Sequence, residues 1–520
     1  MAVSFHRRYL TLVDEIERRF PVSTWKSGDL EVWPLARTDL YLDMYWANTG
    51  SAPPAGRSLP LRVAGRAAMP LRNLWKSRHD LAHQVTRPAP ANAIFLGDGV
   101  SLDRVDGKWR DRFGEPLIAA LERRGHGTFL MQGGYLSRLP WYRPTFAANV
   151  VESRGFLKAL VMRLPMELPG YDGVLDFLAG NAVHAPSLSR IRLERRANAV
   201  AATAAAFEKV LRVVRPTLAF VVTYYAGLGP AFLLACRRQG ILSVDVQRSP
   251  QESALHAYRW ASLPASGYAA LPAVFWAWTK DDAARIDDWA TKLPKPWHSA
   301  IHGGHTQLAP FLDDRHPTTR MWDARFAAIG GVATFDREIL IALQPIHGHR
   351  AVWDALCSQI EASPTSWRWW IRRHPAWHPA QDVESARLLT LSRPNVLIEE
   401  ASSLPLPVLL RHMSALLSLA SGAAVEASIF GTPAFFLIDA ARQSFGELIQ
   451  RGHATVIDVC AASREIARVD KTPARPPPDY QPDISKTLLR LEELAREYRH
   501  ALPPALLTHP GMQQMPESRR

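Results

Sequence analysis

Short apolar runs alternate with longer amphipathic stretches between residues 93 and 457, and this order occurs twice along the chain. In the first half, apolar runs of strand length occupy 93–96, 128–131, 218–222, 241–246 and 274–278. Helical periodicity separates them at 113–124, 197–214 and 229–239, whereas 133–192 shows no clear period. Strands that alternate with helices in this way predict a parallel β-sheet with helices on both faces.

The same pattern restarts at residue 338. Predicted strands are 338–343, 367–372, 395–398, 415–419, 434–437 and 454–457, and predicted helices are 351–361, 385–391, 405–412, 423–430 and 442–451. The predicted fold class is therefore α/β, with two Rossmann-like, doubly wound domains that face a cleft and a mostly helical segment before them.

Changes in composition suggest the domain boundaries. Residues 1–90 form an N-terminal helical and basic segment that includes an amphipathic helix at 5–20. Residues 91–280 form the first Rossmann-like domain, and 281–471 form the second. Residues 472–520 comprise a proline-rich linker, a terminal amphipathic helix at 484–502 and a tail.

The chain of 520 residues is basic, with a formal net charge of +13 and an isoelectric point near 9.8. Between Arg57 and Arg87 there are seven lysines and arginines and a single acid, Asp80. Interleaved with leucine and tryptophan, these residues either contact an anionic membrane surface or form a solvated helix face. A nucleic-acid partner is not expected, since no recognition module is visible.

The three cysteines lie far apart and lack metal-ligand spacing, which argues against disulfides and a zinc site. His302 and His305, and His347 and His349, are interpreted as loop histidines, and we expect neither a metal nor a cofactor. The sequence contains no Rossmann glycine fingerprint and no P-loop. Without an apolar run of about 20 residues or a signal-peptide core, we expect a cytoplasmic protein, peripheral at the inner membrane at most.

The stretch 413–437 has the strongest functional pattern. Its strand, tight turn at Ser421-Gly422, helix and second strand place a helix N-terminus at the carboxyl edge of a parallel sheet, where anions bind. The small residues Ala420, Ser421 and Gly422 leave room for a phosphate, and Glu426 is placed to reach a sugar hydroxyl. The alternative is a buried βαβ unit that packs through its alanines.

Several motifs resemble those of GT-B glycosyltransferases. Arg373-His374-Pro375 resembles the His-Pro motif of CMP-sugar-using bacterial sialyltransferases and Kdo transferases, and Ala420-Ser421-Gly422 stands where that group has its Ser-Ser motif. In the first half, Val246-Gln247-Arg248 and His256-Ala257-Tyr258 resemble a capsule-type Gln-His-Gly and His-x-Tyr pattern, with Arg248 in place of the first histidine. The segment 107–113 is also similar to surface-polysaccharide proteins.

This resemblance implies a metal-independent enzyme that takes a CMP-, UDP- or GDP-linked sugar as donor. The donor phosphates would meet Ser421, Gly422, Arg373 and His374, since a leaving phosphate gains negative charge during transfer. Arg372 and Arg373 alternate across their strand, and we select Arg373 as the one that faces the donor. Further residues that the interpretation assigns to the donor site are Pro375, Gln344 and Glu426, with His347 as another contact. His374 is otherwise a strand-end histidine, and Glu426 a helix-surface carboxylate.

Inversion at a sugar carbon also needs a base to deprotonate the acceptor hydroxyl. Candidates at the carboxyl ends of first-half strands are Asp98, Glu252 and His256, and ordinary loop polarity is the alternative for each. The expected acceptor is a saccharide or a lipid-linked saccharide of surface polysaccharide or lipopolysaccharide. Two other functions stay open: a sugar-nucleotide epimerase of the same fold, and an inactive scaffold, which the missing serine and Arg248 would fit.

Overall fold

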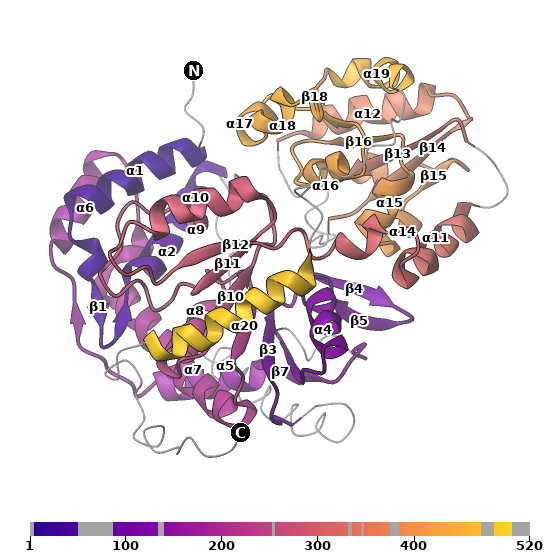
Figure 1. Cartoon of the computed structure of the whole chain (residues 1–520). Coiled ribbons are helices and arrows are strands. Elements are labelled where there is room, and N and C mark those ends of the chain that lie inside the picture. Colours follow the sequence, from indigo (N-terminus) through magenta and orange to yellow (C-terminus); the bar gives the residue numbers. More distant parts are fainter. Residues whose placement is uncertain are drawn as a thin grey trace. The chain divides into compact units, whose positions relative to one another are not determined.

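The computed structural model describes residues 5–49, 87–133, 140–251, 255–330, 335–344, 348–374, 384–469 and 483–501. The chain divides into two compact units (Figure 1). The first unit comprises residues 1–248, 255–303 and 483–520, and the second comprises 249–254 and 304–482. None of the described helices combines the length and the apolar character that a bilayer crossing requires.

The first unit is built on a seven-stranded sheet whose paired strands all run parallel. Numbered along the chain, its strands lie in the order 3-2-1-4-5-6-7. Every strand in the middle of this sheet is buried, as a sheet covered on both faces requires. Across the sheet the strands are β7 (Thr145–Ala147), β6 (Thr128–Gln132), β3 (Ala93–Gly97), β9 (Leu218–Val222), β10 (Leu242–Val246), β11 (Val274–Ala277) and β12 (Ser299–His302).

Helices lie on both faces of this sheet (Figure 1). The terminal helix α20 (Ile484–Ala501) packs on it through Leu488 and Leu491, which share a core with Phe95 and Val244. The long helix α7 packs against α5 and α8. The other elements are α4 (Gly114–Arg123), α5 (Ala148–Ala159), α6 (Tyr171–Gly180), α7 (Arg190–Val214), α8 (Gly229–Arg238), α9 (Leu255–Tyr258), α10 (Lys280–Ala290), and the hairpin β4 (Leu102–Val105) and β5 (Lys108–Asp111).

The N-terminal helical segment packs into the first unit. Glu17 of α1 (Phe5–Arg19) and Arg37 of α2 (Trp33–Thr49) form a buried ion pair at 3.0 Å. The second oxygen of Glu17 accepts a hydrogen bond from Ala261 N at 2.7 Å, and the Arg37 guanidinium lies over the ring of Trp260. Short strands complete the segment: β1 (Lys26–Ser27) pairs with β2 (Leu30–Glu31) and with β8 (Met166–Glu167).

The second unit has a six-stranded parallel sheet in the order 3-2-1-4-5-6. Its strands across the sheet are β15 (Val396–Leu397), β14 (Trp367–Arg372), β13 (Arg337–Ala342), β16 (Ala415–Ser418), β17 (Ala434–Phe436) and β18 (Ala454–Val456). Its helices are α11 (Pro317–Gly330), α12 (Arg350–Ala362), α13 (Ala386–Leu389), α14 (Glu399–Ser403), α15 (Leu406–His412), α16 (Ala423–Ile429), α17 (Ala441–Ser444), α18 (Gly446–Gln450) and α19 (Ala462–Arg468).

Two doubly wound α/β units with a helical N-terminal segment confirm the predicted fold class. Three details differ from the prediction. The first unit continues past residue 280 because β12, which was not predicted, pairs with β11, and α20 joins the first unit although it follows the second in sequence. The predicted helix at 442–451 is two short helices, α17 and α18, that meet at Phe445.

Candidate functional site

In each unit, polar residues collect at the carboxyl edge of the sheet where the strand order reverses. In the first unit the reversal falls between β3 and β9, because the chain builds the sheet outward from β3 on one side and from β9 on the other. Ligands of open α/β sheets bind at such switch points. The loops that follow these two strands are Gly97-Asp98-Gly99 and Thr223-Tyr224-Tyr225.

Gly97 allows two buried polar side chains to meet beside the end of β3. A Cβ at this position would lie 2.1 Å from Gln132 Nε2 and 2.3 Å from Asp111 Oδ2. Gln132 donates a hydrogen bond to Asp111, whose other oxygen accepts from Phe113 N and Gly114 N at the start of α4. Burial raises the pKa of Asp111 to about 6.

The carboxylate of Asp98, a predicted base, organises the loop after β3. Oδ1 accepts hydrogen bonds from Val100 N at 2.8 Å and Ser101 N at 2.7 Å, and Oδ2 accepts from Ser101 Oγ at 2.8 Å. Oδ2 also lies 3.2 Å from Nε of Arg248. These partners hold the Asp98 carboxylate in place as a hydrogen-bond acceptor. Its role as a base stays a prediction.

His256, a second predicted base, packs against two tyrosine rings. The His256 ring stacks on Tyr41 at 3.9 Å between centroids and meets Tyr225 edge-on at 5.0 Å. Burial raises the pKa of Tyr225 to about 12, which the positive charge of Arg248 opposes. The structure therefore places His256, Tyr225, Arg248 and Asp98 at one edge of the sheet. Tyr225 was not selected from the sequence, although its position directly after a strand was a usable signal.

Thr223 adopts a left-handed backbone conformation at the end of β9, with φ of 63°. A β-branched residue rarely adopts positive φ, and such strain costs about 1–3 kcal/mol. Its hydroxyl oxygen is shielded from solvent and has no hydrogen-bond partner among the described residues. Backbone strain at a switch point is typical of a functional loop. The sequence contains no signal for it.

Asp245 is an acid in the middle of the buried strand β10 that sequence reasoning missed. Its carboxyl group accepts hydrogen bonds from Tyr258 Oη at 2.9 Å and Tyr224 N at 3.2 Å. Burial raises its pKa to about 7, against the effect of these two hydrogen bonds. The polar residue within the apolar run 241–246 was the available signal. Asp245 thus helps to hold Tyr224 and Tyr258, in the segments that follow β9 and β10, at the carboxyl edge of the sheet.

In the second unit the strand order reverses between β13 and β16. Gln344, just beyond β13, bonds both backbone polar groups of Ala420, just beyond β16: its Oε1 accepts from Ala420 N and its Nε2 donates to Ala420 O, each at 2.8 Å. Gln344 was predicted to touch the donor. The structure shows it holding the turn, while its donor contact stays a prediction.

Most backbone N–H groups of the turn 420–422 donate hydrogen bonds within the protein, so fewer of them can bind an anion than the sequence predicts. Ser421 N donates to Ser418 Oγ at 3.3 Å, and Ser421 Oγ accepts from Ala423 N at 3.2 Å. Gly422 N has no acceptor among the described residues, and a Cβ on Gly422 would meet only the ring of Pro250, at 3.4 Å. Of the N–H groups in this turn that were expected to bind an anion, only that of Gly422 has no acceptor among the described residues.

Arg372 and Arg373 both interact with α14, which follows β15. Arg372 donates to the carbonyl oxygens of Ala401 and Leu404 and so caps the C-terminal end of that helix. Arg373 pairs with Glu399 at 2.6 Å, and this carboxylate is 78% exposed. An ion pair with so exposed a partner is weak and easily exchanged for a ligand. This difference supports the selection of Arg373 over Arg372.

His374 and Glu426 are half-buried, and Glu426 lies in the first turn of α16. β14, which leads to Arg373 and His374, is separated from β16 by β13, so the two loops are about 10 Å apart, or two strand spacings. Glu252, Pro375 and His347 lie outside the described residues. Within the described ranges there is no group of three or more His, Cys, Asp or Glu residues arranged to hold a metal ion.

No protein-family model matches this sequence, and no curated protein matches it. The chain is similar to several solved structures. UDP-GlcNAc 2-epimerase from Neisseria meningitidis, bound to UDP-GlcNAc, is 14% identical with a TM-score of 0.45, over 77% of this chain and 99% of the other. The Staphylococcus aureus MnaA–UDP structure is 13% identical with a TM-score of 0.46, over 79% and 98%. The glycosyltransferase SnogD from Streptomyces nogalater is 14% identical with a TM-score of 0.40, over 80% and 96%.

Proposed function

We propose that this protein is a metal-independent glycosyltransferase that moves a sugar from a nucleotide-sugar donor to a surface-polysaccharide or lipopolysaccharide acceptor. The observation that carries the donor site is the Gly422 N–H at the switch point of the second sheet, for which the described residues provide no acceptor. The Gln344–Ala420 pairing fixes the turn that presents it. A backbone donor held in place before a ligand arrives stabilises developing charge without reorganisation.

The donor phosphate is proposed to bind Gly422 N, Arg373 and His374. As the bond to the sugar breaks, the phosphate gains negative charge, and each contact becomes stronger. A hydrogen bond to a charged group contributes about 1.5–3 kcal/mol. Arg373 reaches the phosphate by exchanging its exposed partner Glu399, while Ser421 and Glu426 are proposed to contact the rest of the donor.

The acceptor is proposed to bind at the carboxyl edge of the first sheet, beside Asp98, Arg248 and Tyr225. His256 is our preferred base of the predicted three, because the carboxylate of Asp98 already accepts three hydrogen bonds and faces Arg248. Tyr41 stacks on the face of the His256 ring and so fixes the plane in which the ring nitrogens take up or release a proton. Glu252 stays a candidate for the same role.

A lipid-linked acceptor would place the protein at the cytoplasmic face of the inner membrane. Besides the basic segment around 57–87, of which 57–86 lie outside the described residues, the end of α5 supports this proposal. Leu160 and Val161 are 56% and 81% exposed, and the exposed Lys158 and Arg163 lie beside them. Apolar side chains among basic residues fit an anionic bilayer surface.

Vesicle sedimentation tests the membrane contact. Vesicles that contain phosphatidylglycerol should retain the protein and phosphatidylcholine vesicles should not, and Val161→Asp should weaken retention. Leu489→Asp on α20 is a matched control, because Leu489 is also exposed, at 48%, and lies on another helix. Equal retention of both variants would show that the end of α5 does not contact the membrane.

A nucleotide screen tests the donor site. Thermal unfolding in the presence of CMP, UDP and GDP should show stabilisation by one of them. Gly422→Pro removes the proposed N–H donor but fits the observed φ of −58°, whereas Gly422→Ala keeps the donor. Binding should therefore be lost in the first variant and kept in the second. Arg373→Ala and His374→Ala should weaken binding, and Arg468→Ala, an exposed arginine of the same unit, should not.

Analysis of the reaction products distinguishes the transferase from the epimerase and the inactive scaffold. Transfer to an oligosaccharide acceptor in the presence of EDTA would support a metal-independent transferase. Conversion of the bound sugar nucleotide into an epimer without acceptor would identify the epimerase instead. A failure of all three nucleotides to bind would favour the inactive scaffold and overturn the proposed function.

A further inference from the structure

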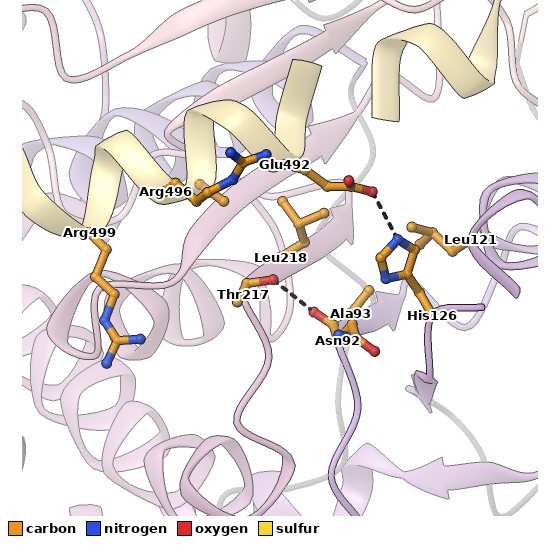
Figure 2. A pocket seen from close by; sticks show the side chains of 10 residues that line it. Asn92, Ala93, Leu121, His126, Thr217, Leu218, Glu492, Arg496 and Arg499 are labelled. Carbon is orange, nitrogen blue, oxygen red and sulfur yellow. Dashed lines mark hydrogen bonds and ion pairs between the residues drawn. The ribbon is translucent and has the colours of Figure 1, made fainter. Parts of the chain in front are cut away.

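A cavity of about 350 Å³ lies in the first unit at the amino ends of β3 and β9, the sheet edge opposite to Asp98 and Tyr225. Helix α20 forms one wall of it, and β3, β9 and the end of α4 form the others (Figure 2). A volume of this size lies within the range of small-molecule sites. The lining residues from α20 are Glu492, Ala495, Arg496 and Arg499, whose spacing places them on one face of the helix.

The inner part of the cavity is apolar. Ala93, Leu121, Leu218 and Ala495 line it, and all four are buried. The backbone N–H groups at the strand ends are already bonded: Ala93 N donates to Gly127 O, and Leu218 N to Asn92 O. The floor of the cavity therefore offers contact to a ring or a short chain and no backbone donor from these strands.

The rim carries uncompensated positive charge. Glu492 is neutralised within the protein, since both of its oxygens lie 3.0 Å from Arg124 Nη2 and one lies 3.2 Å from His126 Nε2. Figure 2 shows Glu492 reaching from α20 to His126 while Arg499 extends from the same helix further along. Arg496 and Arg499 have no acidic partner among the described residues. Of the charged residues that line the cavity, the two arginines therefore stand beside a single carboxylate, Glu492, whose charge is already balanced by Arg124.

We propose that this cavity binds a small organic anion, whose ring or chain rests on Leu121, Leu218 and Ala495 and whose phosphate or carboxylate binds Arg496 and Arg499. Guanidinium groups bind both anions through paired N–H donors. Exposed arginines alone are ordinary, but here they stand at the mouth of an apolar cavity. The ligand contacts α20 and the sheet together, so its binding stabilises the docking of the terminal helix.

Calorimetric titration of the full-length protein tests the proposal. The probes are phenyl phosphate and benzoate, which combine a ring with each kind of anion, and inorganic phosphate, which lacks the ring. At least one ring-bearing probe should bind saturably and at least tenfold more tightly than inorganic phosphate. The double variant Arg496→Gln/Arg499→Gln should weaken that binding at least tenfold. Arg490→Gln is the matched control, because Arg490 lies on the same helix and pairs with Glu493.

Three results would overturn the proposal: no saturable binding of either ring-bearing probe, affinity unchanged in the double variant, or equal affinity for inorganic phosphate. The substituted residues are exposed and have no acidic partner in the described part of the chain, so loss of the fold is not expected, and circular dichroism checks it. The test is independent of the proposed transferase function. Gly422→Pro should leave the affinity for the probe intact while it abolishes nucleotide binding, so the two sites can fail separately.

Discussion

The amide of Gln344 and the backbone of Ala420 exchange two hydrogen bonds of 2.8 Å across the switch point of the second sheet. This pairing joins the loops after β13 and β16 at the point where a ligand is expected. We predict that Gln344→Ala weakens nucleotide binding by at least tenfold, because the turn that presents Gly422 N loses its fixed position. Breaking both bonds should cost about 1–3 kcal/mol in the free energy of unfolding. Calorimetry and urea unfolding measure the two effects.

Gln239→Ala provides the control for this prediction. Gln239 also donates its amide to a backbone carbonyl, that of Glu208 at 3.0 Å, but it lies in the first unit. Its substitution should lower stability modestly and leave the nucleotide affinity unchanged. If Gln344→Ala behaved in the same way, the pairing would be a structural bond without a role in the donor site.

The strained Thr223 should gain stability when it is replaced by glycine. Glycine adopts φ of 63° without strain, and the substitution also removes a hydroxyl that is shielded from solvent and has no partner among the described residues. We expect Thr223→Gly to raise the free energy of unfolding by about 1 kcal/mol and to lower the proposed transferase activity, because the loop becomes less ordered. Arg215→Gly is a matched control, since Arg215 has φ of 52° at the end of α7, away from the site. Lost activity in both variants would contradict a specific role for Thr223.

Most of the fold was predictable because buried parallel strands correspond to short apolar runs in the sequence. The predicted and observed strands agree closely from β9 to β11 and from β13 to β18. The prediction failed for 133–192, where α5, α6 and β8 are only partly buried and β7, although buried, is only three residues long. β12 was missed for the same reason, since all four of its residues are only half-buried.

The candidate site was predictable in position and less so in detail. Asp98, His256, Gln344 and the turn 420–422 do lie at carboxyl edges, because strand order alone decides which loops gather there. Sequence reasoning could not show that the N–H groups of Ala420 and Ser421 donate hydrogen bonds within the protein. Nor could it show that the Asp98 carboxylate already accepts three hydrogen bonds. The bond to Ala420 N comes from Gln344, which is distant in sequence, whereas the other bonds depend on local turn geometry, and periodicity reports neither.

The buried pair of Glu17 and Arg37 should be essential for the first unit. Both side chains are almost fully buried, and Glu17 also accepts from Trp33 Nε1 at 2.9 Å. Arg37→Met would leave a buried carboxylate without its cation, at a cost of roughly 3–5 kcal/mol. The matched substitution Arg19→Met removes an exposed pair with Glu15 and a cation–π contact with Phe177, and should cost at most about 1.5 kcal/mol. Urea unfolding distinguishes them, and equal costs would mean that the N-terminal helices do not depend on this pair.

Asp245 should make the protein less stable as the pH rises toward 7. Its pKa is about 7 in the folded protein and near 3.9 in an unfolded chain, so the folded state binds the proton more tightly. The resulting stabilisation is complete below about pH 4 and is lost as the pH rises through 7, with a slope of at most about 1.4 kcal/mol per pH unit. Asp111, whose pKa is about 6, acts in the same direction.

Asp245→Asn removes this titration. One donor, from Tyr258 Oη or Tyr224 N, then faces an amide N–H instead of an acceptor, so the variant should be less stable than the wild type at pH 5. Its free energy of unfolding should nevertheless fall less between pH 5 and pH 8, because only Asp111 of the two acids still titrates there. Urea unfolding at several pH values gives both slopes. Identical slopes would show that Asp245 is charged in the folded protein throughout this range, and that burial does not hold its proton.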